Sequence, residues 1–297
     1  MRSWSEAWET ALYGPSGFFL QERPLDHFRT NVAVPLFATA VRRLAGLVDL
    51  ALGSPDPFDL VDLGAGRGEL LAALPDVPPR WRLTAVDLAP GLRSDVPEVE
   101  GLLIANEWLD NVPLDVLEEG RLVLVSPDGR ESLGAPLSSG WADTWWPPEV
   151  VGDRAEPARP DLPHRVEIGA SRDLAWAAAV ARVRRGLAVA VDYGHTVADR
   201  RPTLTGYRDG RQVRPVPDGS CDLTAHVALD SCAAATGSRL VRQGEALRSL
   251  GVTATPSADG VGLEQASQAR ELLDPDGLGG FGWLVRPVGL EVGWMGV

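Results

Sequence analysis

A glycine-rich stretch that follows an aspartate is the part of this sequence best suited to chemistry. Asp62 closes an apolar run, and the order Asp-Leu-Gly-Ala-Gly-Arg-Gly places Gly64, Ala65, Gly66 and Gly68 in one loop. Glycines let a backbone turn tightly and approach a ligand closely. The spacing is GxGxG, whereas dinucleotide-binding folds use GxGxxG. Asp62 would repel a pyrophosphate but suits the ammonium of a methionine moiety, so the pattern favours a sulfonium nucleoside as ligand.

A second carboxylate stands where a nucleoside ligand would need it. Asp87 comes near the end of the next apolar run, about 20 residues further along, and could accept hydrogen bonds from both hydroxyls of a ribose. An ordinary strand-to-helix turn would explain the glycines alone. Because Asp62 and Asp87 both stand at expected strand ends, a ligand cradle is the better interpretation.

Polar residues also crowd the end of a third apolar run. Asn106, Glu107 and Asp110 follow residues 101–105, and open α/β sheets bind ligands at the carboxyl ends of their strands. Asn106 and Glu107 are predicted to reach the amino and sulfonium region of the ligand, and Asp110 to face an acceptor. Carboxylates would localise the charge of a guanidinium nucleophile. A helix-capping cluster is the alternative.

The elements that must position these residues alternate between strands and helices. A long amphipathic helix with Asn31 as its cap is expected first, and then strands that alternate with helices. This alternation predicts an α/β fold with a parallel sheet. The expected helices cover residues 31–52, 68–74, 171–185, 225–236 and 263–273, and the expected strands cover residues 58–63, 81–88, 101–105, 186–193, 239–242 and 281–288.

One stretch interrupts this alternation. Residues 115–136 combine short apolar runs with turn residues and predict antiparallel strands. Residues 138–165 are rich in tryptophan and proline and predict an irregular insertion over the sheet. We therefore expect an N-terminal helical segment (1–52) that packs on the core, a core made of residues 53–114 and 166–297, and an inserted antiparallel and irregular region (115–165).

Composition limits the partners of the chain. A net charge of −13 over 297 residues argues against nucleic acid or an anionic membrane surface as a partner. Neither cysteine has the spacing of a metal site, and no apolar run approaches the roughly 18 residues of a membrane span. We expect a cytoplasmic protein without a metal, and the sequence predicts no oligomeric state.

The sequence resembles the MidA-like methyltransferases, a family that includes a mitochondrial complex I assembly factor. The resemblance covers nearly the whole chain in ordered pieces. They are residues 11–15, 17–19, 28–30, 64–68, 105–110, Glu167, 185–187, 191–194, 222–227 and 243–247.

The resemblance implies a class I methyltransferase (Rossmann-like) fold with a doubly wound, mostly parallel sheet and S-adenosyl-L-methionine as methyl donor. It also implies an arginine of a partner protein as acceptor, for which a respiratory-complex subunit is a candidate. It places Thr30 near the cofactor, where a plain N-terminal cap is the alternative. Phe28 is a substrate-side candidate. Tyr193 is another, and a tyrosine in a strand-end turn is its alternative.

The chain departs from the family pattern after Asp87. Too few residues separate Asp87 from Leu102 for the additional strand that the family has there, and residues 94–100 are expected to be its remnant. That region helps hold the adenine, so altered adenine contacts are expected. A non-catalytic assembly protein that keeps the fold is therefore the alternative function. A nicotinamide-dependent oxidoreductase would require a pyrophosphate beside Asp62.

Overall fold

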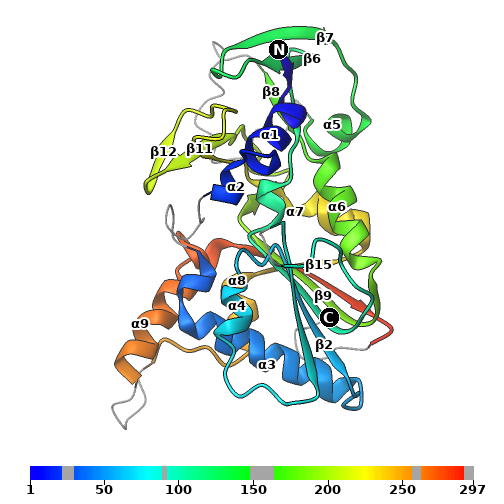
Figure 1. The fold of residues 1–297 in the computed structure, drawn as a ribbon, viewed down its shortest axis with the longest axis vertical. Helices are drawn as coiled ribbons and strands as arrows, with labels where there is room; N and C mark the ends of the chain where they lie inside the picture. Colours follow the sequence, from blue (N-terminus) through cyan, green and yellow to red (C-terminus); the bar gives the residue numbers. More distant parts are fainter. Residues whose placement is uncertain (22–29, 89–91, 148–163, 256–261, 291–297) are drawn as a thin grey trace. The chain divides into compact units, whose positions relative to one another are not determined.

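The computed structural model describes residues 1–21, 30–88, 92–147, 164–255 and 262–290. The chain forms two compact units, each made of three separate stretches (Figure 1). Unit 1 comprises Met1–Phe28, Leu109–Ala175 and Gly194–Ala235, and unit 2 comprises Arg29–Trp108, Trp176–Tyr193 and Thr236–Val297.

Unit 2 contains a six-stranded sheet in the order β15-β16-β9-β4-β2-β3. Neighbours from β9 to β3 pair in parallel, whereas β16 runs antiparallel to both β9 and β15. The α/β class expected from the sequence is confirmed, but the sheet is mixed. The strands are β2 (Phe58–Leu63), β3 (Trp81–Val86), β4 (Val99–Asn106), β9 (Val183–Asp192), β15 (Arg239–Arg242) and β16 (Gly282–Val288).

The direction of β16 follows from the path of the chain. Strand β15 ends at Arg242, which pairs with Gly282 at the start of β16. Helices α8 (Gln243–Ser249) and α9 (Gly262–Leu273) and the short helix η4 (Leu278–Gly280) lie between them in sequence. Because these helices return the chain to the edge where β15 ended, β16 must run back in the opposite direction. The expectation of parallel strands is wrong here.

Helix α3 (Pro35–Ala51) packs on this sheet (Figure 1). Its buried side chains Phe37, Val41, Leu44 and Val48 share one core with the strands. Asn31 does not cap this helix, because it begins the separate 3-10 helix η2 (Asn31–Ala33). Pro35 stands at the start of α3, where its fixed φ is favourable and its missing N–H is not needed.

Unit 1 is built on an antiparallel sheet in the order β1-β6-β5-β8, with β7 also paired to β6. The antiparallel strands expected within residues 115–136 are confirmed. Trp4, Trp8 and Leu12 of α1 (Trp4–Tyr13) pack against this sheet in one core. The strands are β1 (Arg2–Ser3), β5 (Asp115–Glu118), β6 (Arg121–Val125), β7 (Glu131–Pro136) and β8 (Arg165–Ile168).

The units divide the chain at other positions than the boundaries expected at residues 52, 114 and 165. The apolar face of α1 packs within unit 1, whereas that of α3 packs within unit 2, so residues 1–52 do not form one segment. Residues 194–235 also belong to unit 1, although we expected them in the core. Buried apolar faces, rather than continuity of the chain, decide these boundaries.

Unit 1 also contains several short helices and strands outside that sheet. Trp146 packs with Leu117 and Val166 of this antiparallel sheet, whereas we expected residues 138–165 to lie over the parallel sheet of the core. Residues 148–163 of the predicted insertion lie outside the described residues. The helix expected from residue 225 begins at Leu229, because the preceding residues pair as strands. These elements are α2 (Phe18–Gln21), η3 (Leu109–Asn111), α5 (Gly140–Trp145), β10 (Gly194–His195), β11 (Thr205–Arg208), β12 (Arg211–Val213), β13 (Asp222–Thr224), β14 (Val227–Ala228) and α7 (Leu229–Thr236).

Helix α6 (Ala170–Val180) contributes residues to both units, since the boundary falls after Ala175. Within the stretches that the structure describes, no helix is long and apolar enough to cross a membrane.

Candidate functional site

Four adjacent parallel strands of unit 2 end at one edge of its sheet. Leu63 at the end of β2 pairs with Val86 of β3 and with Ala105 of β4. Asn106 at the end of β4 pairs with Val191 of β9. This register brings together the carboxyl ends of these strands, where α/β sheets bind ligands. The residues at or just beyond these ends include Asp62, Asp87, Glu107 and Tyr193.

The glycine loop after β2 needs its glycines for conformation and for space. Gly64, Gly66 and Gly68 have φ values of 74°, 60° and 88°, in the left-handed region that side chains disfavour. A Cβ on Gly64 would lie 2.7 Å from Cδ1 of Trp108. The amides of Gly64 and Ala65 donate to the Val86 carbonyl at 2.9 and 3.2 Å, which ties the loop to β3.

We expect Gly64→Ala to weaken binding of S-adenosyl-L-methionine, the methyl donor that the resemblance implies, at least about tenfold. The added methyl group would push the loop away from Trp108 and add about 1–2 kcal/mol of backbone strain. Calorimetric titration of the purified variant measures the loss. Gly53→Ala is the matched control, since Gly53 has a φ of 82° and open space around its Cβ position. Equal losses of affinity in both variants would show that strain alone causes the effect.

Asp62 is buried beside the loop and is 2% exposed. Its Oδ2 has no hydrogen-bond partner among the described residues. Burial, together with the smaller effects of the neighbouring Asp87 and Glu69 carboxylates, raises the pKa of this carboxyl group to about 7. A buried carboxylate oxygen without a donor is costly. An ammonium group that approaches along the loop would satisfy it.

Asp87 orders the loop from the neighbouring strand. Its Oδ2 accepts a hydrogen bond from the Gly66 amide at 2.9 Å. The sequence predicted a contact with ribose for this residue, and the contact with the loop places the carboxylate beside the glycines. Asp87 therefore lies with the other residues of the predicted cradle.

The segment after Asp87 is short, as expected, but differs in detail. Its only described pairing with the sheet is an isolated parallel bridge between Val86 and Arg93, and the Asp87 amide donates to the Arg93 carbonyl at 2.8 Å. The remnant strand expected at residues 94–100 is absent from this described stretch, because β4 already begins at Val99. A single bridged residue thus stands where the resemblance implies a strand.

Glu107 has an unusual backbone conformation just after β4. Its φ of 52° is costly for a residue with a side chain, by about 1–2 kcal/mol. Its amide donates to the Val191 carbonyl at 2.8 Å. Its Oε1 accepts from the Asn31 amide at 2.8 Å and from Nδ2 of Asn106 at 3.1 Å. Such strain persists where surrounding contacts determine the conformation, and it is concentrated at functional sites.

A chain of buried amide side chains continues from Glu107. Asn31 Nδ2 donates to Asn106 Oδ1 at 3.1 Å, and Gln243 Nε2 donates to Asn31 Oδ1 at 2.7 Å. Trp283 Nε1 donates to Gln243 Oε1 at 3.0 Å. Our sequence reasoning assigned Asn31 to a helix cap and gave Gln243 and Trp283 no role. Residues 243–247 are one piece of the family resemblance, but no local pattern shows which groups Asn31, Gln243 and Trp283 bind.

The other predicted residues of unit 2 have mixed outcomes. Thr30 precedes η2 but makes no side-chain cap hydrogen bond, so the cap alternative is wrong. Its buried hydroxyl has no partner in the part of the chain that the structure describes. The Tyr193 ring packs 5.5 Å from that of Phe281, and its acceptor role stays a prediction. Phe28 lies outside the described residues.

Asp110 belongs to unit 1, whereas Glu107 belongs to unit 2. Its buried Oδ2 accepts from the Thr224 hydroxyl at 2.8 Å, and its carbonyl accepts from the guanidinium of Arg172. Asp222 lies in the same unit, and burial together with the Asp110 carboxylate raises the pKa of Asp222. These contacts give Asp110 a structural role, and its predicted catalytic role stays a prediction.

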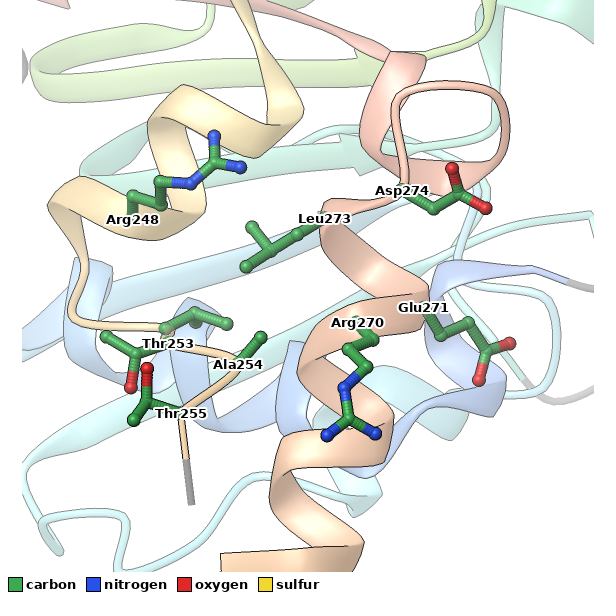
Figure 2. A pocket seen from close by; sticks show the side chains of 9 residues that line it. Arg248, Thr253, Ala254, Thr255, Arg270, Glu271, Leu273 and Asp274 are labelled. Carbon is green, nitrogen blue, oxygen red and sulfur yellow. The ribbon is translucent and has the colours of Figure 1, made fainter. Parts of the chain in front are cut away.

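A groove of about 660 Å³ lies elsewhere in unit 2, between α8, the loop after it and α9 (Figure 2). It is lined by polar and apolar side chains and contains none of the predicted site residues. The described residues include no cluster of His, Cys, Asp or Glu side chains that could hold a metal ion.

Comparison with known proteins shows the family of the chain. The model of a family described as "Putative S-adenosyl-L-methionine-dependent methyltransferase" matches residues 74–245, which is more than half of the chain. Among curated protein sequences, none matches this chain.

Two solved structures from Burkholderia thailandensis share the fold. One is a COG1565 superfamily member described as a "likely methyl transferase" and bound to S-adenosyl-homocysteine, with a TM-score of 0.73, 21% identity, and coverage of 98% of this chain and 88% of that one. The other is an uncharacterized protein of the same superfamily, with a TM-score of 0.75, 20% identity, and coverage of 99% and 89%. The methyl donor expected from the sequence is thus confirmed at the level of the family, and the chain belongs to the family of S-adenosyl-L-methionine-dependent methyltransferases.

Proposed function

We propose that this protein transfers a methyl group from S-adenosyl-L-methionine to a guanidinium nitrogen of a protein acceptor. The observation that carries the proposal is Asp62, a buried carboxylate with an oxygen that lacks a partner among the described residues, beside a glycine loop. The fold class, the glycine spacing and the family all agree with a sulfonium nucleoside as ligand.

The residues of unit 2 fit this cofactor. Asp62 would accept the ammonium of its methionine part, and the backbone of Gly64 to Gly68 would lie against it. Asp87, on the next strand, would hold the ribose hydroxyls. Thr30 and Asn106 complete the proposed set, Thr30 through its buried hydroxyl. These contacts would align the reactive methyl group with an incoming nitrogen.

Glu107 is the proposed catalytic residue. The bound cofactor supplies a methyl group that is activated by the positive sulfur. The Glu107 carboxylate holds the acceptor guanidinium by charge-assisted hydrogen bonds and localises its charge. As the bond between the nitrogen and the methyl carbon forms, the bond from that carbon to the sulfur would break and leave S-adenosyl-L-homocysteine. The nitrogen would lose a proton, and the Glu107 carboxylate is proposed to accept it. The contacts from Asn31 and Asn106 hold that carboxylate in one orientation.

The acceptor is proposed to be an arginine in a partner protein, and the resemblance makes a respiratory-complex subunit the first candidate. A net charge of −13 favours a cationic partner over nucleic acid. Tyr193 and Phe28 are proposed on the acceptor side.

The proposal is tested by incubating the protein with S-adenosyl-L-methionine labelled on its methyl group and with a lysate of the host. A labelled protein band whose hydrolysate contains methylarginine is the expected result. Label in another amino acid would overturn the arginine acceptor but not methyl transfer. A boiled sample of the protein is the control for nonenzymatic labelling.

The alternative is a non-catalytic assembly protein. The single bridged residue at Arg93 favours this alternative, because a segment without a full strand offers fewer residues to contact the adenine. Calorimetric titration with S-adenosyl-L-homocysteine separates the two functions. Binding below about millimolar concentration supports the enzyme, since each tenfold in affinity corresponds to about 1.4 kcal/mol. The absence of binding up to that concentration would support the assembly protein.

A further inference from the structure

The orientation of Glu107 depends on residues far from it in sequence. We propose that Gln243 is a positioning residue, which sets the Glu107 carboxylate through Asn31 and Asn106. The proposal rests on the proposed function for the role of Glu107, but its structural part holds without any ligand. All the residues involved belong to unit 2.

The indole of Trp283 gives the chain of hydrogen bonds its direction. An indole N–H can only donate, so the Gln243 side chain must turn its oxygen toward Trp283. Its NH₂ group then faces Asn31 Oδ1, at 2.7 Å. One donor-only group at the end of the chain therefore selects one of the two orientations of the Gln243 amide.

The orientation of the Gln243 amide in turn determines the orientations of the Asn31 and Asn106 amides. Because the oxygen of Asn31 accepts from Gln243, its NH₂ group is the one that donates to Asn106 Oδ1, at 3.1 Å. The NH₂ group of Asn106 is then left to donate to Glu107 Oε1, also at 3.1 Å. The Trp283 donor thus fixes the orientations of the Gln243, Asn31 and Asn106 amides in turn, so that the Asn106 NH₂ group faces the Glu107 carboxylate.

Burial strongly favours this one set of amide orientations over the flipped ones. Asn31, Gln243 and Trp283 are fully buried, and Asn106 is nearly so. A flipped amide would place two oxygens or two NH₂ groups face to face in this environment, which is costly. Asn31 also donates its backbone N–H to Glu107 Oε1, so a shift of Asn31 would move both donors on this oxygen. Gln243 therefore influences Glu107 by two routes.

The test replaces Gln243 with methionine, which keeps the length of the side chain and removes both hydrogen bonds. We expect kcat to fall about tenfold, which corresponds to the loss of one to two hydrogen bonds. In the background of Glu107→Gln, Gln243→Met should cause no further loss of kcat, because its effect passes through the carboxylate. An additional tenfold loss there would overturn the proposal.

A measurement without ligand keeps the proposal separate from the proposed function. In the ¹H–¹⁵N spectrum of the ligand-free protein, Gln243→Met should shift the Asn31 backbone amide and the Asn106 side-chain NH₂ signals. Unchanged signals would overturn the positioning role even in an active enzyme. If the wild type transfers no methyl group, the proposed function fails, and these signals still decide the positioning role.

Two further variants complete the design. Gln268→Met is the matched control, because Gln268 is also a hydrogen-bonded glutamine of unit 2, with its Oε1 accepting from the Leu36 amide. It should leave kcat and the Asn31 and Asn106 signals unchanged. If Gln243→Met does not fold, Trp283→Phe removes the donor that sets the direction, together with part of the buried ring, and it should shift the same signals. Unchanged signals in Trp283→Phe would equally overturn the proposal.

Discussion

Asp62→Asn is expected to weaken cofactor binding strongly and at the same time to stabilise the ligand-free fold above pH 7. The Asp62 carboxyl group has a pKa of about 7 in the folded protein, against an ordinary value of 3.8, chiefly because of its burial. A raised carboxyl pKa means that the folded state binds the proton more tightly than the unfolded state. The contribution of Asp62 to stability is therefore greatest below pH 3.8 and is lost as the pH rises to about 7.

Asparagine has no carboxylate to bury, so the gain of the variant over the wild type should grow between about pH 4 and pH 7 and then level off. Its upper limit is about 4 kcal/mol, since one pKa unit corresponds to about 1.4 kcal/mol. Thermal unfolding at a series of pH values measures the gain. A variant with the same pH dependence of the unfolding temperature as the wild type would show that Asp62 does not titrate in this range.

The affinity for the cofactor should depend on pH in the opposite sense to the stability contribution of Asp62, and should rise with pH. An ammonium ligand needs the ionised form of Asp62, so the wild-type affinity for S-adenosyl-L-homocysteine should rise on the order of tenfold from pH 5.5 to pH 7.5. In Asp62→Asn the affinity should be lower and nearly independent of pH in this range. Calorimetric titration at both pH values measures it.

Asp59→Asn is the matched control on the same strand. Asp59 is also buried, but its carboxylate accepts from the Arg82 guanidinium and from the Glu100 amide at 3.0 Å. Its removal should lower the unfolding temperature and leave cofactor affinity unchanged. A common effect of both substitutions on affinity would mean that disturbance of β2, rather than the Asp62 charge, controls binding.

Glu107→Gln is expected to reduce kcat by about 10²- to 10³-fold, in the range typical of a lost acid or base. Glutamine keeps an oxygen that can accept from the Asn31 amide and from Asn106 Nδ2, so the backbone conformation at this position should persist. What is lost is the negative charge that would hold the guanidinium and take its proton. Affinity for S-adenosyl-L-homocysteine should change less than about threefold.

Initial rates with the labelled methyl donor and the identified acceptor protein measure this effect. Glu9→Gln is the control, because Glu9 is exposed on helix α1. A Glu107→Gln variant with the wild-type kcat would remove Glu107 from the mechanism. Loss of affinity for S-adenosyl-L-homocysteine with an unchanged kcat would instead make Glu107 a cofactor-binding residue.

The residues of the proposed cradle could be identified from the sequence because their signals are local. The order of Asp62 and the glycines sets a strand end and a tight turn within a few residues, and Asp87 follows at the end of the next strand. Each needs only its own neighbours to be recognised, and parallel pairing then places the strand ends side by side.

The domain boundaries and the direction of β16 were not predictable in this way. Helices α1 and α3 have similar amphipathic patterns, and nothing in those patterns states that one packs within unit 1 and the other within unit 2. Strand β16 has the residues of any buried strand, and its direction follows from the path of the helices before it.

The sequence by itself therefore determined the α/β fold class and predicted the nucleoside cradle with Asn106 and Glu107 beside it, because short-range patterns specify strand ends and turns. Only the tertiary structure decided what holds Glu107. Asn31 and Gln243 are 212 residues apart, and Gln243 and Trp283 are 40 apart. The identity of an amide side chain does not reveal which group it will bind, since an amide can both donate and accept hydrogen bonds. Its partner and orientation follow from which buried groups the folded sheet brings within hydrogen-bond distance.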